Sequence, residues 1–214
     1  MKRQKDFCIA ICMLTAFLLW TAALHFVDTQ MIGPLGSTVG FATINQFIHG
    51  LTGVHISLYA ITDWLGLVPL VFILGFALLG LMQWIKRKHL FQVDYSLLVL
   101  GGYYIVVMAV YILFEVFVVN YRPVLIHGYL EASYPSSTTM LVMCVMPTAV
   151  MQLNVRIKNE PLRRCTASAI TAFALFMVIC RLISGVHWFT DIVGGILISA
   201  GLVLLYCAVI RQKI

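Results

Sequence analysis

Long hydrophobic runs alternate with short polar segments along this chain. Six of the runs are long enough to cross a bilayer as helices, because about 20 apolar residues span the hydrocarbon core. They cover residues 7–27, 65–85, 95–119, 136–153, 166–183 and 188–210. The first run could instead belong to a signal peptide, but it is long for one and lacks a small-residue cleavage site. We therefore predict an all-α fold, a six-span transmembrane bundle that forms a single domain over residues 1–214.

The polar segment between the first two runs has a pattern of its own. It contains no Lys or Arg between Asp28 and Asp63. Phe41, Ile44, Phe47, Ile48 and Leu51 recur at helical spacing. This spacing fits a short helix in the membrane interface, beside a point of lipid access, and it fits ordinary loop packing equally well.

Composition narrows the class of protein. The chain is 62% hydrophobic and only 10% charged, which excludes an ordinary soluble domain. A net charge of +6 would suggest a nucleic-acid partner in a soluble protein. Here the basic segments 2–5, 86–88, 156–164 and 211–213 all fall on one side of the six-span model, as cytoplasmic loops do. We therefore expect no nucleic-acid partner, cytoplasmic termini, and a multi-pass protein of the cell membrane.

Two basic residues, Arg122 and Arg181, fall on the opposite side, where topology does not explain them. The stretch after Arg181 contains His187 and Asp191, whose i, i+4 spacing would place them on one helix face. An imidazole backed by a carboxylate has a fixed tautomer and acts as a nucleophile or a base. These residues predict a reactive site at the extracytoplasmic face.

The start of the fourth run predicts an anion site. Pro135 is followed by hydroxyl residues, a combination typical of a helix start with a Ser or Thr N-cap. A helix N-terminus presents free N–H groups and the positive end of a dipole to an anion. Guanidinium groups match phosphate oxygens in a forked geometry. Together with Arg122 and Arg181, this helix start predicts a phosphate site beside His187.

Three segments resemble the motifs of the type 2 phosphatidic acid phosphatases, a family that shares a core with vanadium haloperoxidases. The family pattern is Lys-x6-Arg-Pro, then Pro-Ser-Gly-His, then Ser-Arg-x5-His-x3-Asp. The matching residues are Arg122-Pro123, Pro135-Ser136, and Arg181, His187 and Asp191 at the spacing of the third motif. The order of the motifs and the six-span layout also agree.

The resemblance implies an integral membrane hydrolase with no metal or other cofactor. His187 would attack phosphorus to form a phosphohistidine, and Asp191 would orient its ring. Water would then hydrolyse this intermediate. The implied substrate is a membrane lipid phosphate or a polyprenyl diphosphate such as undecaprenyl diphosphate. The implied phosphate-binding residues are Arg122, Pro123, Ser136, Ser137 and Arg181.

The chain departs from the pattern at four positions. Two departures are mild, Ser137 for glycine and Cys180 for serine. The other two place Glu115 at the lysine position and Thr138 at the position of the general-acid histidine. General acid catalysis typically contributes about 10²–10⁴ in rate, so its loss at Thr138 matters.

Three explanations of the missing acid remain open. A phosphate leaving group has a second pKa of about 6 and can depart unprotonated, which favours a diphosphate lipid. Glu115, about two turns before Arg122, or His127 in the following loop could supply the proton instead. Glu115 could also pair with Arg122.

The departures also leave two alternative functions. A phosphatase-like protein that has lost turnover would bind a lipid head group without cleaving it. A carboxylate at position 115 would repel a phosphate dianion, and this favours a diester or a zwitterionic head group, hence a phosphodiester head-group transferase. The sequence predicts no particular oligomeric state.

Overall fold

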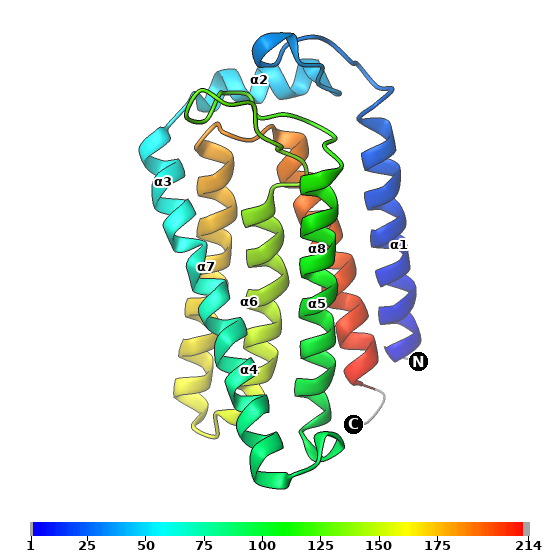
Figure 1. Cartoon of the computed structure of the whole chain (residues 1–214), viewed down its shortest axis with the longest axis vertical. Coiled ribbons are helices and arrows are strands. Elements are labelled where there is room, and N and C mark those ends of the chain that lie inside the picture. Colours follow the sequence, from blue (N-terminus) through cyan, green and yellow to red (C-terminus); the bar gives the residue numbers. More distant parts are fainter. Residues whose placement is uncertain (1, 212–214) are drawn as a thin grey trace.

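The chain folds into a bundle of long helices (Figure 1). The computed structural model describes residues 2–211. The long helices are α1 (Lys2–Ala23), α4 (Leu67–Arg87), α5 (Tyr95–Val116), α6 (Ser137–Arg156), α7 (Glu160–Ile183) and α8 (Phe189–Ile210). Shorter elements are α2 (Ala42–Thr52), α3 (Ile56–Leu65) and 3-10 turns at Pro34–Gly36 and Leu90–Gln92. The described residues form no strand, only isolated bridges, so the predicted all-α class is confirmed.

Six helical segments of the described residues are long and apolar enough to span a membrane, as predicted. The second is longer than expected, because α3 and α4 together form one segment of 32 residues, Ile56–Arg87. The polar residues Thr62 and Asp63 interrupt the hydrophobic pattern, and for this reason the pattern predicted that the second span begins at residue 65. A helix of this length reaches about 48 Å, well beyond a hydrocarbon core of about 30 Å. The α3 end therefore extends to the level of the outer loops.

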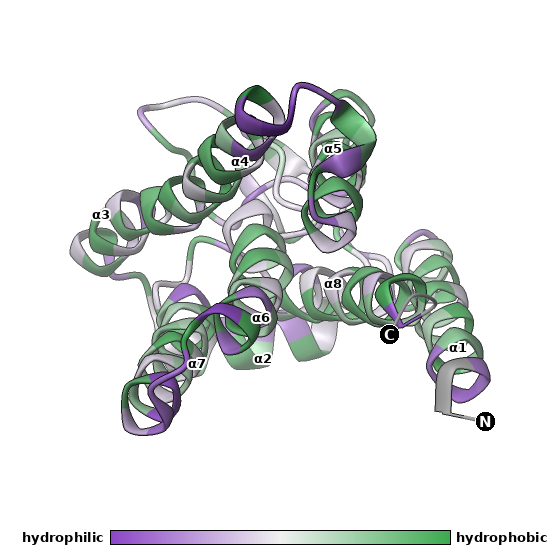
Figure 2. Ribbon diagram, turned by 90° about the horizontal axis from the view of Figure 1, so that it is seen from below, coloured by the Kyte–Doolittle hydropathy of each residue, from purple (hydrophilic) through white to green (hydrophobic). Residues whose placement is uncertain are grey.

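Helix α6 lies at the centre of the bundle (Figure 2). It packs against α4, α5, α7 and α8, and α1 packs along the far side of α8. The buried face of α6 contributes Val142, Val145, Met146 and Ala149 to the core. Apolar side chains such as Leu19 and Leu74 are exposed on the outer helices, as a surface in contact with lipid requires.

The helix considered for residues 41–51 is present as α2, which lies across the upper end of the bundle in Figure 1. Its buried Asn45 ties it to the start of α8. The Asn45 side chain donates to Thr190 Oγ1 at 3.0 Å and accepts from the Thr190 backbone N–H at 3.1 Å. Its other face exposes Phe47 and Leu51. Helix α2 therefore covers the end of the bundle that carries the candidate site.

Candidate active site

His187 lies in the turn between α7 and α8, and the local chain geometry fixes its position. Gly185 adopts a left-handed conformation with φ of 66°, which reverses the chain after α7. Helix α8 begins at Phe189, so His187 precedes the helix and does not share a helix face with Asp191 as the spacing suggested. Asp191 caps the helix instead, because its Oδ2 accepts the backbone N–H of Trp188 at 2.9 Å.

Ser133 links His187 to Asp191. The Nδ1 of His187 lies 3.9 Å from Asp191 Oδ2, which is too far for a hydrogen bond. The Ser133 hydroxyl donates to Asp191 Oδ2 and its oxygen lies 3.0 Å from His187 Nδ1. Asn120 Nδ2 donates to the other Asp191 oxygen at 3.4 Å. The tautomer that satisfies these contacts carries its proton on Nδ1 and leaves a lone pair on Nε2.

The environment of His187 keeps the imidazole neutral. Its side chain is almost fully buried. Burial, with the nearby positive charges of Arg122 and Arg181, holds the pKa of His187 well below its ordinary value. A neutral ring with a free Nε2 has the form that nucleophilic attack requires.

Arg122 reaches His187 because the loop between α5 and α6 folds back on itself. The Ser133 N–H donates to Asn120 O at 2.9 Å, and the Arg122 N–H donates to Glu131 O at 3.1 Å. These bonds place Arg122 Nη1 3.5 Å from Nε2 of His187. The guanidinium also lies 3.1 Å from the Glu131 carboxylate, measured from Nε to Oε2. A phosphate held by Arg122 would therefore lie beside the free nitrogen of His187.

Arg181, in the last turn of α7, is held by three residues of α3. Its Nη1 donates to Thr62 Oγ1 at 3.1 Å, and its Nη2 lies 3.5 Å from Asp63 Oδ1. The ring of Tyr59 lies against both guanidinium groups, with its centre 4.7 Å from Arg181 Cζ and 5.5 Å from Arg122 Cζ. Helix α3 therefore helps to fix the spacing of the two arginines.

The start of α6 contributes one side chain to the site. Ser137 lines the cavity that contains both arginines. Ser136 is the N-cap of α6, but its side chain makes no capping hydrogen bond and its hydroxyl is buried without a partner among the described residues. Thr138 lines an adjacent, mainly apolar cavity. The general-acid position of the family pattern therefore does not face the arginines here.

The remaining predicted residues differ in their placement. Glu115 lines the same cavity as the arginines, but Arg122 pairs with Glu131 and not with Glu115. Pro123 is half-buried next to Arg122 and has no side-chain donor. His127 lies exposed in a tight turn and does not line the cavity.

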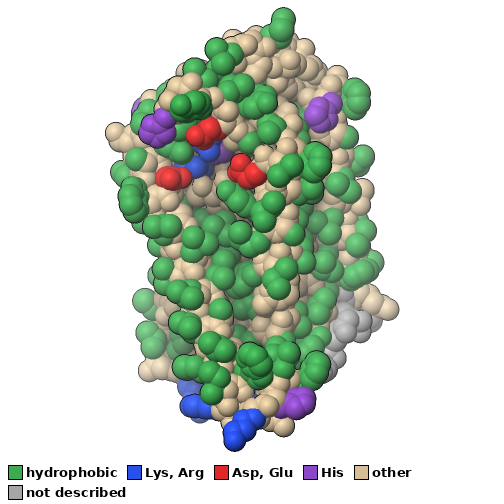
Figure 3. All heavy atoms as spheres, viewed as in Figure 1, with side chains coloured by type: hydrophobic (Ala, Val, Ile, Leu, Met, Phe, Trp, Pro, Cys, Tyr) green, Lys and Arg blue, Asp and Glu red, His purple; other side chains and the backbone are tan. Residues whose placement is uncertain are grey.

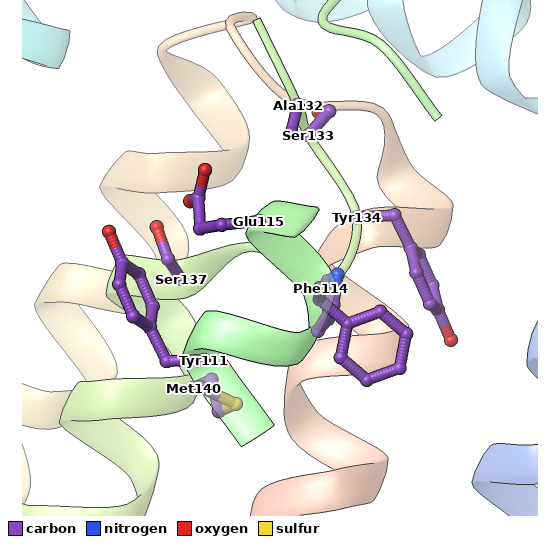
Figure 4. Close-up of a pocket in the computed structure, with 9 residues that line it drawn as sticks. Tyr111, Phe114, Glu115, Ala132, Ser133, Tyr134, Ser137 and Met140 are labelled. Carbon is purple, nitrogen blue, oxygen red and sulfur yellow. The ribbon is translucent and has the colours of Figure 1, made fainter. Parts of the chain in front are cut away.

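The cavity has a volume of about 630 Å³ and a polar lining. It adjoins a smaller pocket, shown in Figure 4, in which Tyr111, Glu115 and Ser137 direct their polar ends toward the same space. The described residues include no cluster of metal-binding side chains.

Sequence reasoning missed several residues that complete the site. Ser133 lies two residues before Pro135, and nothing in its spacing indicates a contact with Asp191. Tyr59, Thr62 and Asp63 carry a usable signal, because they recur at i, i+3 and i+4 beside an apolar run and so share one helix face.

Comparisons with known proteins bear on the fold and the family. A crystal structure described as the first transmembrane PAP2-type phosphatidylglycerolphosphate phosphatase from Bacillus subtilis matches with a TM-score of 0.61, 19% identity and 96% coverage of each chain. At this identity the match shows a common fold. The comparison with curated protein sequences found no match. The model of the PAP2 superfamily matches residues 96–214, more than half of the chain and the part that contains His187. The chain belongs to the PAP2 superfamily.

Proposed function

We propose that this chain is a membrane phosphatase that hydrolyses a lipid phosphate or a polyprenyl diphosphate through a phosphohistidine on His187. The observation that carries the proposal is the environment of its ring. Nδ1 faces Ser133, which donates to Asp191, while the unprotonated Nε2 faces a guanidinium nitrogen of Arg122 at 3.5 Å. This arrangement supports a nucleophile directed at a bound phosphate.

The proposed reaction has two steps. Nε2 of His187 forms a bond to the terminal phosphorus as the bond from this phosphorus to the leaving oxygen breaks, and Arg122 and Arg181 stabilise the charge on the phosphoryl oxygens. The leaving oxygen is the ester oxygen of a monoester or the bridging oxygen of a diphosphate, which leaves as the lipid monophosphate. Water then attacks phosphorus and releases inorganic phosphate and the neutral imidazole. Thr138 does not face the arginines, so we assign it no proton transfer. A diphosphate lipid needs none at the leaving oxygen, whereas a monoester requires a proton donor.

Apolar cavities beside the site support a lipid substrate. A groove of about 850 Å³ lies between α4 and α5, and its lining includes the exposed residues Ile105 and Ile112. A second cavity of about 300 Å³ shares Met108 with this groove and Tyr111 with the polar cavity. An acyl or prenyl chain could lie along this path while its phosphate reaches the arginines.

The proposed location is the extracytoplasmic face of the cell membrane. Lys and Arg side chains are visible at the lower end of the molecule in Figure 3, opposite the site. The positive-inside rule assigns that lower end to the cytoplasm.

The test is phosphate release from purified protein in detergent. Monoester, diphosphate and diester lipids with equal chains are compared for the wild type, His187→Ala, and His89→Ala as a control at an exposed histidine between α4 and α5. We expect the wild type and His89→Ala to release phosphate equally and His187→Ala to lose at least about 10³-fold. Equal release by His187→Ala would exclude the mechanism. If the wild type is inactive and Thr138→His gains activity, the chain is a head-group-binding protein that has lost turnover.

A further inference from the structure

The polar cavity holds more negative than positive charge. Five charged side chains line it, two arginines and three carboxylates: Asp63, Glu115, Arg122, Glu131 and Arg181. Figure 3 shows acidic side chains gathered around a basic one near the upper end of the molecule. A phosphate dianion alone would add further negative charge to a site that is already one unit negative.

Two of the three carboxylates are paired. Glu131 lies 3.1 Å from Arg122, and Asp63 lies 3.5 Å from Arg181. Glu115 forms no ion pair with any residue in the range 2–211 that the structure describes. Its carboxylate lies beside the polar ends of Tyr111 and Ser137 (Figure 4). Glu115 is therefore the cavity carboxyl that has no cation partner among the described residues.

The two arginines retain donors for an anion. The side chain of Arg181 is 1% exposed and that of Arg122 is 10% exposed. The Nε of each is buried without a hydrogen-bond partner among the described residues. For Arg122 this holds although Glu131 is close, because the contact is not aligned as a hydrogen bond. Buried donors of this kind are costly unless a ligand accepts from them. The cavity is therefore lined by two arginines whose Nε atoms are unpaired and by Glu115, a carboxyl with no cation partner among the described residues.

We propose that the substrate brings both charges: a phosphate for the two arginines and, close to it, an ammonium group for Glu115. This deepens the phosphatase proposal and rests on it for the position of the phosphate. The side chains of Asp63 and Glu131 are 60% and 40% exposed, so each can rotate away when a phosphate replaces it as the partner of its arginine. In this arrangement, the carboxylates of Asp63 and Glu131 lie beside the ammonium group together with that of Glu115.

The three carboxylates of the cavity disfavour lipids whose head group has no positive charge. A head group without a cation places its phosphate among three carboxylates, and like charges brought together at a binding site lower affinity. Glu115 stands where the related family pattern has lysine, so the charge at this position is reversed. The cavity therefore selects for a head group that carries its own positive charge.

The test uses two matched phosphonates that the protein cannot hydrolyse. They share one alkyl chain and differ in a single group two carbons from phosphorus, an ammonium in one and the acetylated, neutral amide in the other. Binding to the purified full chain is measured in detergent with EDTA at pH 7.5, and hydrolysis of the two corresponding phosphates is measured in parallel. We expect the wild type to bind the ammonium compound about fivefold more tightly, at the upper end of the range for exposed charge pairs.

Three variants locate the effect. Glu115→Gln should reduce the preference to about twofold or less. Glu115→Lys should reverse it and bind the amide compound more tightly than the wild type does, a gain that a folding defect cannot produce. Glu160→Gln removes a carboxylate of α7 that pairs with Arg164, outside the cavity, and should keep the full preference.

The outcomes separate the two proposals. A binding preference without any phosphate release leaves the cation subsite standing and overturns the phosphatase. If phosphate is released from both compounds with equal kcat/KM and there is no binding preference, the phosphatase proposal stands and the cation subsite is overturned. A preference that is unchanged in Glu115→Gln, or one that appears only when EDTA is replaced by a divalent cation, overturns the ammonium subsite.

Discussion

At the scale of single residues, the site differs from a direct His–Asp pair. Because the Ser133 hydroxyl lies between the imidazole and the carboxylate, Asp191 acts on His187 through a third group. The same hydroxyl accepts from Nδ1 and donates to Asp191, and the backbone carbonyl of Ser133 accepts from Nδ1 at 3.2 Å, so both groups favour the tautomer with its proton on Nδ1. Asp191 also caps α8, which couples the orientation of the ring to the start of the helix. Ser133 is therefore a positioning residue and has no contact with the phosphate in the proposed mechanism.

Removing this hydroxyl should slow the reaction without weakening substrate binding. We expect Ser133→Ala to lower kcat by about 10–10²-fold, because the ring loses its link to Asp191 and keeps only the Ser133 carbonyl as a partner of Nδ1, while KM stays within about twofold. The measurement is steady-state phosphate release.

Two further variants provide the controls. Ser133→Thr keeps a hydroxyl and should recover most of kcat, and Ser168→Ala on the exposed face of α7 should match the wild type. If Ser133→Thr is as slow as Ser133→Ala, the hydroxyl does not position His187.

At the scale of elements, the turn between α7 and α8 depends on a close contact with the segment between α2 and α3. A Cβ on Gly185 would lie 1.8 Å from Gly53 O, so a side chain there must displace one of the two backbones. The neighbouring bond from His55 N–H to Ser184 O, at 2.9 Å, joins the same segments. The position of His187 therefore depends on a segment more than 130 residues earlier in the chain.

Gly185→Ala tests this contact against a matched glycine. Gly128 also has a positive φ, 83°, but no atom lies within 4 Å of its hypothetical Cβ. Both substitutions incur the backbone cost of about 1–2 kcal/mol. Only Gly185→Ala adds a clash, which typically costs about 1–3 kcal/mol more, and it should also lower kcat/KM by at least about tenfold.

The measurements are the thermal midpoint in detergent and phosphate release for both variants. Equal losses in Gly185→Ala and Gly128→Ala would mean that the contact with Gly53 does not matter.

The elements also show what the sequence could predict. The spanning helices were predictable because a lipid-exposed backbone must satisfy its own hydrogen bonds, so long apolar runs become helices. The spacing of Tyr59, Thr62 and Asp63 is compatible with a helix at α3, but the role of this helix was not predictable, since it depends on the contacts of these residues with Arg181. Those contacts join residues 118 or more positions apart, and no local pattern encodes them. The same holds for Ser133, whose two partners come from the segment around the start of α8.

At the scale of the whole molecule, charge is distributed unequally between the two ends of the bundle. Lys and Arg side chains are visible at the lower end of the molecule in Figure 3, whereas the two arginines of the site are held by carboxylates. A six-span layout with this distribution favours cytoplasmic termini.

Alkaline phosphatase fusions, which are active only outside the cytoplasm, test this orientation. We expect activity for a fusion after Leu125, in the loop between α5 and α6, because that loop carries the site. Fusions after His89 and after Arg211 should be inactive, because positive charges retain these ends in the cytoplasm. If the fusion after Arg211 is active and the fusion after Leu125 is inactive, the protein has the opposite orientation and the site faces the cytoplasm.

The groove between α4 and α5 bears on which substrate concentration sets the reaction rate. A lipid that reaches His187 along this groove arrives by lateral diffusion in two dimensions and never crosses bulk water. The concentration that sets the rate is then its mole fraction in the surrounding lipid or detergent. Diluting the substrate with inert lipid at a fixed total amount slows such an enzyme, while adding buffer at a fixed lipid composition does not.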